Sequence, residues 1–177
     1  YSDKGDLEQA EILYKRCLEA RERILGKDNP ETMITCFSLA ECLSQMERQK
    51  EAIILRRKEL TWRRKEKGNH DWRTLSSIHF LAIDLREHGE LNEAESLFRE
   101  LIAIRQELLS PEDHEIGRAL GGLAKTLEKG GQLKEALIYA QQCLDHRLQY
   151  EGKDSFYTNR NRLDLARVLS KLERNEE

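Results

Sequence analysis

Residues that interrupt regular structure are scarce in this chain, which has two prolines and ten glycines among 177 residues. Together with 38% hydrophobic and 36% charged residues, this scarcity excludes a disordered linker and favours helices. No apolar run is long enough to cross a membrane, so the sequence excludes a transmembrane helix. The formal net charge is only −3, and charges of both signs are mixed, which argues against a dedicated nucleic-acid binder.

Residue patterns that hold metals or carry out catalysis are also missing. No two cysteines form a C-x-x-C pair, and no histidine follows a cysteine pair at zinc-finger spacing. No nucleophile stands near a candidate base, so we expect a protein without enzyme activity, metal or other cofactor. The cysteines are expected to be small buried hydrophobic residues in a reducing, cytoplasmic compartment. They are Cys17, Cys36, Cys42 and Cys143.

The chain instead contains a repeat with a period of 42 residues. A Leu-Ala pair, a second alanine, a leucine and an arginine each recur at this spacing, which is typical of a stacked array of similar units. The Leu-Ala pairs lie at 39–40, 81–82, 123–124 and 165–166, and the second alanines are Ala10, Ala52, Ala94 and Ala136. The leucines are Leu43, Leu85, Leu127 and Leu169, and the arginines are Arg21, Arg63, Arg105 and Arg147.

Each unit is predicted to consist of two helices. Apolar residues recur at i, i+3, i+4 and i+7, as in Cys36, Leu39, Ala40 and Leu43, which indicates a helix with one buried stripe. The alanines mark the places where two helix axes cross closely. The first helices are expected at 31–45, 73–88, 115–129 and 157–172, and the second helices at 6–25, 49–66, 91–109 and 133–151.

The segments between these helices contain residues typical of helix ends. Gly26, Gly68 and Gly152 follow second helices, as glycine caps at helix C-termini do. Thr32 and Thr74 open the next helices beside polar and acidic residues that suit N-caps. The connections are therefore short, as in packed antiparallel helix pairs.

On two recurring segments the chain resembles the tetratricopeptide repeat family, in the 42-residue variety found in kinesin light chains. These segments are Gly-Glu-Leu-Asn-Glu-Ala-Glu at 89–95 and Leu-Gly-Lys-Asp-Asn-Pro at 25–30. The resemblance covers essentially the whole chain. It implies an all-α, right-handed superhelical solenoid of antiparallel helix pairs, in which the first helices line a concave groove.

We expect residues 1–177 to form a single repeat array. The second helix of a partial repeat spans 5–30, complete repeats span 31–71, 72–114 and 115–155, and the first helix of a further partial repeat spans 156–177. Neither end has the polar outer face of a capping repeat, so we expect a fragment of a longer protein. Its uncovered ends are predicted to allow self-association.

The resemblance also implies which residues would face the groove. The C-terminal part of this set is mostly basic, which favours a protein or peptide partner of acidic character. Family members that hold peptides often carry asparagine just before the Leu-Ala pair, and this chain lacks it. The groove candidates are Phe37, Glu41, His79, Phe80, Ile83, Arg86, Arg118, Gly121, Gly122, Lys125, Lys129, Arg160, Leu163 and Arg167, with Ile34 and Ser76 on the same face.

Two functions follow from this prediction. The first is a protein–protein interaction scaffold that binds a peptide or partner domain in its groove. The alternative is a regulatory or sensor arm of a larger signalling NTPase or protease, in contact with its own catalytic domain or with a trigger protein. The groove aromatics could also simply pack against each other or against a neighbouring domain.

Two further segments have competing interpretations. The basic stretch 56–67 could bind phosphate or nucleic acid with Trp62 stacking, but we favour a solvated face with a local Arg56–Glu59 ion pair. Gly117, Gly121 and Gly122 lie inside a predicted helix at a cost of about 1 kcal/mol each. No phosphate-loop core surrounds them, so we expect a neighbouring element or a ligand to approach the backbone closely there.

Overall fold

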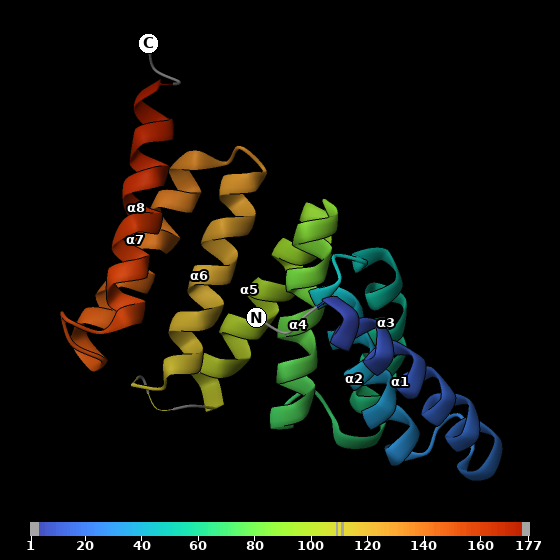
Figure 1. Ribbon diagram of the computed structural model, residues 1–177. Coiled ribbons are helices and arrows are strands. Elements are labelled where there is room, and N and C mark those ends of the chain that lie inside the picture. The colour runs from blue at the N-terminus through green and yellow to red at the C-terminus, as the bar shows by residue number, and fades with distance from the viewer. Residues whose placement is uncertain (1–3, 109, 111, 175–177) are drawn as a thin grey trace. The chain divides into compact units, whose positions relative to one another are not determined.

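Every regular element in the described part of the chain is a helix (Figure 1). The computed structural model describes residues 4–108, 110 and 112–174. This confirms the all-helical prediction, and the predicted helix bounds agree with the observed ones to within two residues. The helices are α1 (Lys4–Leu25), α2 (Pro30–Gln45), α3 (Gln49–Lys67), α4 (Trp72–His88), α5 (Leu91–Leu108), α6 (His114–Lys129), α7 (Leu133–Tyr150) and α8 (Phe156–Arg174).

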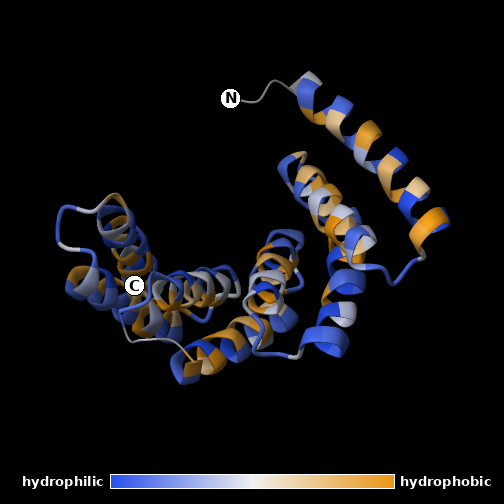
Figure 2. Cartoon of the chain, turned by 90° about the horizontal axis from the view of Figure 1, so that it is seen from below, coloured by the Kyte–Doolittle hydropathy of each residue, from blue (hydrophilic) through white to orange (hydrophobic). Residues whose placement is uncertain are grey.

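The chain divides into two compact units, residues 1–88 and 89–177. In unit 1, α1 packs on α2, α2 on α3 and α3 on α4. In unit 2, the same order holds for α5 to α8. Consecutive helices are thus the packing partners within each unit, as the repeat predicts, and both hydrophobic and hydrophilic residues occur on every helix (Figure 2).

Side chains before the helices satisfy their first backbone N–H groups. The Asn29 side chain accepts a hydrogen bond from the Glu31 N–H at 2.9 Å, and Asp113 accepts one from Glu115 at 2.8 Å. Inside the first turn of α2, the Thr32 hydroxyl donates to the Gly26 carbonyl at 2.9 Å. Gly26 itself has a φ of +93°, a conformation that other residues adopt at a cost. These contacts fix where α2 and α6 begin after their short connections.

Alanines occupy the predicted crossing points between packed helices. Ala40 and Ala82 of the Leu-Ala pairs are fully buried, and so are Ala52 and Ala94 of the second alanine column. A methyl side chain at these points lets two helix axes approach closely. The burial of these alanines agrees with the role assigned to the columns, whereas Ala10 in α1 is half-buried and Ala166 in α8 is exposed.

The cysteines behave as small hydrophobic residues. All four are free thiols, and three of them, Cys36, Cys42 and Cys143, are buried. Burial raises the pKa of these three thiols because it disfavours the thiolate. They are therefore poor nucleophiles, and their role is packing.

Among the described residues, no helix is both long and apolar enough to cross a membrane.

Replacing Ala82 with Leu should overfill a helix crossing and lower the free energy of unfolding by about 1–3 kcal/mol. Ala166 occupies the same repeat position in α8 and is exposed, so Ala166→Leu is the matched control and should change stability by less than about 0.5 kcal/mol. Urea unfolding followed by circular dichroism measures both. Equal effects of the two substitutions would contradict the crossing assignment.

Candidate functional site

The predicted groove residues occupy two surfaces, one in each unit. In unit 1 they lie on α2 and α4, and we call this surface the α2/α4 face. In unit 2 they lie on α6 and α8, and we call this the α6/α8 face. The two faces differ in what lies beneath them and in how their charges are paired.

Beneath the α2/α4 face, a buried arginine of α3 connects the two helices. The Arg56 side chain is only 1% exposed, its Nε donates a hydrogen bond to Asp84 of α4, and its Nη2 donates to Glu41 of α2 at 2.8 Å. Its guanidinium carbon lies 5.1 Å from the ring centre of Phe37 and 4.9 Å from that of Phe80. The two rings meet edge to face, with centres 5.6 Å apart. Arg56 therefore holds both groove aromatics in fixed positions through ion-pair and cation–π contacts.

The preferred interpretation of stretch 56–67 was wrong for these residues. Arg56 and Glu59 are both buried, and Glu59 pairs with Arg63 rather than with Arg56. The reason is that α3 packs against both α2 and α4, which places this side of α3 inside the unit. The repeat itself carried a signal, since the positions 42 residues later hold the apolar residues Phe98 and Leu101.

Unit 2 fills the equivalent space in a different way. Phe98, at the repeat position of Arg56, is fully buried, and Gly122 stands at the repeat position of Phe80. A Cβ atom added at Gly122 would lie 2.6 Å from Cζ of Phe98, closer than such atoms can approach. The glycine thus leaves room for the ring, and the expected close approach at this position comes from α5.

The neighbouring glycines of α6 are in contact with α7. A Cβ at Gly121 would lie 3.3 Å from the Cys143 sulfur, and one at Gly117 would lie 3.0 Å from Nε of Arg147. Packing between helices therefore accounts for all three glycines within α6. A ligand contact at Gly121 or Gly122 stays a prediction.

On the α6/α8 face, the basic residues are largely paired with carboxylates of the same face. Lys125 Nζ lies 3.0 Å from Asp164 Oδ2, and Arg167 Nε donates to Glu128 Oε1 at 2.8 Å. Burial alone would raise the pKa of Glu128, but hydrogen bonds from Arg167 and Lys171 lower it below its usual value. The positive charge that would attract an acidic partner here is therefore much reduced.

The remaining groove candidates vary in exposure. His79 is buried and stacks edge to face on Phe80, while Ile83 and Arg86 are half-buried. Arg118 is exposed and pairs with Glu115. The exposed candidates of unit 2 include Lys129, Arg160 and Leu163. A role of these positions in binding stays a prediction.

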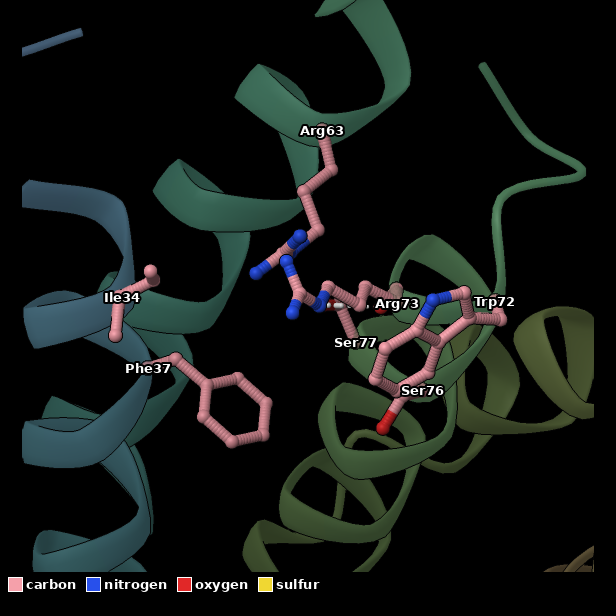
Figure 3. Close-up of a pocket in the computed structure, with 7 residues that line it drawn as sticks. All are labelled: Ile34, Phe37, Arg63, Trp72, Arg73, Ser76 and Ser77. Atoms are coloured by element: carbon pink, nitrogen blue, oxygen red, sulfur yellow. Dashed lines mark hydrogen bonds between the residues drawn. The ribbon is translucent and has the colours of Figure 1, made fainter. Parts of the chain in front are cut away.

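A pocket of about 260 Å³ opens on the α2/α4 face (Figure 3). Of the groove candidates, it includes Phe37, and two further lining residues, Ile34 and Ser76, were expected on this face. The other four were not predicted, and the available signal was a tryptophan followed by an arginine, where two of the other three repeats have glutamate at the second position. The four are Arg63, Trp72, Arg73 and Ser77.

Among the described residues, no cluster of three or more histidine, cysteine or acidic side chains could hold a metal ion.

Replacing Asp84 with Ala should lower the free energy of unfolding by about 3–5 kcal/mol, because it leaves the Arg56 guanidinium buried with a single carboxylate partner. The triple variant Arg56→Phe, Phe80→Gly and Asp84→Thr introduces the residues found at the equivalent positions of unit 2. It should lower the free energy of unfolding by much less. Denaturant unfolding compares the two. A single substitution that costs less than about 1 kcal/mol would show that the ion pair adds little to stability.

Replacing Gly122 with Ala should destabilise unit 2 by about 1–3 kcal/mol, since the clash with the buried Phe98 ring exceeds the gain in helix propensity. Adding Phe98→Leu should restore part of this loss, which a double-mutant cycle measures. Gly5→Ala in α1 is the matched control, because a Cβ there meets no atom within 4 Å. Additive effects of the two substitutions in unit 2 would argue against the proposed contact.

Comparisons with known proteins agree with this architecture. Residues 1–65 and 73–149 match the tetratricopeptide repeat family. A comparison with curated protein sequences gives no match.

Three solved structures share the fold at low sequence identity. The repeats of a protein from Podosopora anserina described as a kinesin light chain give a TM-score of 0.87 at 20% identity, over 99% of this chain and 83% of that one. BtubC (BKLC) from P. vanneervenii gives 0.74 at 17% identity, over 84% and 59%. PlcR from Bacillus thuringiensis, in complex with the peptide PapR7 and DNA, gives 0.67 at 16% identity, over 98% and 65%.

The 42-residue period, the eight helices packed in consecutive pairs along the described residues, and the family match lead to one conclusion: this chain belongs to the tetratricopeptide repeat family.

Proposed function

We propose that this chain is a protein-interaction scaffold that binds a peptide, or an extended segment of a partner protein, on the α2/α4 face of unit 1. Tetratricopeptide repeats generally mediate binding to proteins or peptides, and the family match brings this chain into that class. The observation that carries the proposal is the pocket between α2, α3 and α4, with its apolar walls.

Large apolar side chains at this pocket are open to solvent. Trp72 is 68% exposed and Ile34 is 41% exposed. Exposed apolar residues beside a concave site are typical of surfaces that meet a partner, because burying them on binding is favourable. An aromatic anchor of this kind also often carries a large share of the binding energy.

The pocket is also supported from beneath. Arg56 fixes Phe37 by a cation–π contact and by its ion pairs across α2 and α4. A wall that is already ordered loses little conformational entropy when a partner binds. The α2/α4 face is therefore preorganised for a ligand.

The α6/α8 face is a weaker candidate for the same role. The cavity that includes Lys125, Glu128 and Asp164 measures only about 10 Å³. A partner there would also have to replace the existing ion pairs of Lys125 and Arg167. We therefore assign binding to unit 1.

PlcR supports the proposal at the level of the fold. That protein was solved in complex with the peptide PapR7 and DNA, and its fold is similar to that of this chain. At 16% identity the likeness concerns the fold alone, so the position and chemistry of the site rest on the residues described above.

The test is a selection of random peptides displayed on phage against the whole chain. Individual binders should lose at least about tenfold in affinity, or 1.4 kcal/mol, with Ile34→Asp or Trp72→Ala, since both remove apolar contact area at the pocket. The matched control is Ile54→Asp in α3, which changes an isoleucine that is 64% exposed and does not line the pocket.

Thermal melts of all three variants check that the fold is kept. Selected peptides that bind the pocket variants as tightly as the unchanged chain would place binding elsewhere and refute the proposal.

A further inference from the structure

In two repeats, the recurrent arginine at the end of the second helix holds a glutamate ten residues later. Arg21 Nη2 lies 3.1 Å from Glu31 Oε2, and Arg105 Nη2 donates to Glu115 Oε2 at 2.6 Å. In both repeats Nη1 also donates to the main-chain carbonyl of the same glutamate at 2.8 Å. Two of the four repeats thus place a glutamate beside this arginine. In the last repeat the residue ten positions after Arg147 is Tyr157, whose ring centre lies 5.1 Å from the Arg147 guanidinium carbon.

The repeat between the two that have glutamate departs from that pattern. The recurrent arginine is Arg63, and the residue ten positions later is Arg73 instead of glutamate. The Arg63 side chain is 9% exposed and its Nε donates to Glu59, but its terminal nitrogens form no hydrogen bond with any described residue. Solvent reaches these terminal nitrogens, so a ligand in the pocket can accept hydrogen bonds from them.

Both arginines line the pocket of the α2/α4 face, and no acidic residue lines it. In Figure 3, the side chains of Arg63 from α3 and Arg73 from α4 point into the same space. The Arg73 guanidinium carbon also lies 4.9 Å from the ring centre of Trp72. Two like charges at one site favour an anion between them, and guanidinium groups bind carboxylates through paired hydrogen bonds.

We propose that this pocket binds the carboxylate of an acidic side chain in a partner peptide, between Arg63 and Arg73. The neighbouring apolar residue of the peptide packs on Ile34, Phe37 and Trp72, which form the uncharged walls of the same pocket. This assignment rests on the proposed peptide-binding function and adds the chemistry that the site recognises.

A carboxylate is favoured over a phosphate because the protein already uses carboxylates at this position. Glu31 and Glu115 occupy it in the two repeats where the chain supplies its own acceptor. In this repeat Arg73 stands where the other two have glutamate, so the partner supplies the carboxylate. Ser76 also lines the pocket, and its hydroxyl offers one more donor to the bound oxygen atoms.

Three blocked tripeptides test the proposal by NMR titration of the ¹⁵N-labelled chain. The probes are acetyl-Leu-Glu-Leu-amide, its Gln analogue and its phosphoserine analogue. The readouts are the indole N–H of Trp72 and the Nε–H of Arg63. The chain has two tryptophans, so the spectrum of a Trp62→Phe variant assigns the Trp72 signal.

We expect the Glu peptide to shift both signals and to bind at least about tenfold more tightly than the Gln peptide, because only the former brings a carboxylate. Its affinity should fall with added salt, as charge pairing at a partly exposed site is screened. The phosphoserine peptide should bind no more tightly than the Glu peptide.

The decisive variant is Arg73→Glu, which restores the residue found at this position in two other repeats. We expect it to give Arg63 a second internal carboxylate beside Glu59, to melt at or above the temperature of the unchanged chain, and to abolish the preference for Glu over Gln. Arg73→Gln should also remove the preference, without adding the internal ion pair. The matched control is Lys50→Glu, which makes the same charge change at an exposed residue. Lys50 lies at the N-terminal end of α3, far along the helix from Arg63, so this variant should leave the preference for Glu over Gln intact.

Equal binding of the Glu and Gln peptides, or an unchanged preference in Arg73→Glu, would overturn the carboxylate assignment. Tighter binding of the phosphoserine peptide would overturn it in favour of a phosphorylated partner. In these cases the peptide-binding proposal stands as long as binding still depends on Ile34 and Trp72. Binding that is independent of those two residues would refute the proposed function itself.

Discussion

Close packing of paired helices at small side chains is the constraint on which the rest of this structure depends. Ala40, Ala52, Ala82 and Ala94 are fully buried at helix crossings, where a larger residue would separate the helix axes. Because these alanines recur every 42 residues, the same two-helix geometry recurs with them. The repeat therefore fixes which side of each helix is buried and leaves the other positions free to differ between repeats.

The space beneath the two candidate faces shows how far those other positions differ. Unit 1 places Arg56 between two aromatic rings and neutralises it with Asp84 and Glu41. Unit 2 places Phe98 at the equivalent position and removes the side chain at Gly122 to make room for it. Each arrangement requires matching residues at several positions, because a buried charge must be paired and a buried ring must have space around it. The consequence is that the α2/α4 face has aromatic walls and an open pocket, whereas the α6/α8 face is occupied by ion pairs.

The proposed binding site arises where the chain departs from its own repeat. Glu31 and Glu115 satisfy the recurrent arginine in their repeats, and Arg73 does not. Arg63 keeps one internal carboxylate, Glu59, but its terminal nitrogens have no such partner. A departure from a local rule often marks a functional position, since a partner can supply the remaining contact. Comparison of a repeat protein with itself thus identifies candidate sites that an inspection of single motifs misses.

The sequence by itself determined the helices, their ends and the residues at the helix crossings. These features depend on local patterns: apolar residues at helical spacing, polar caps such as Asn29 and Asp113, and an alanine every 42 residues. Only the tertiary structure decided which charges are buried and which of them are paired. Arg56 and Asp84 are 28 positions apart in the chain, and Arg167 and Glu128 are 39 apart, so their pairing depends on how separate helices pack. For the same reason the pocket with Arg63, Trp72 and Arg73 was not predicted, because two helices must meet before the two arginines face one space.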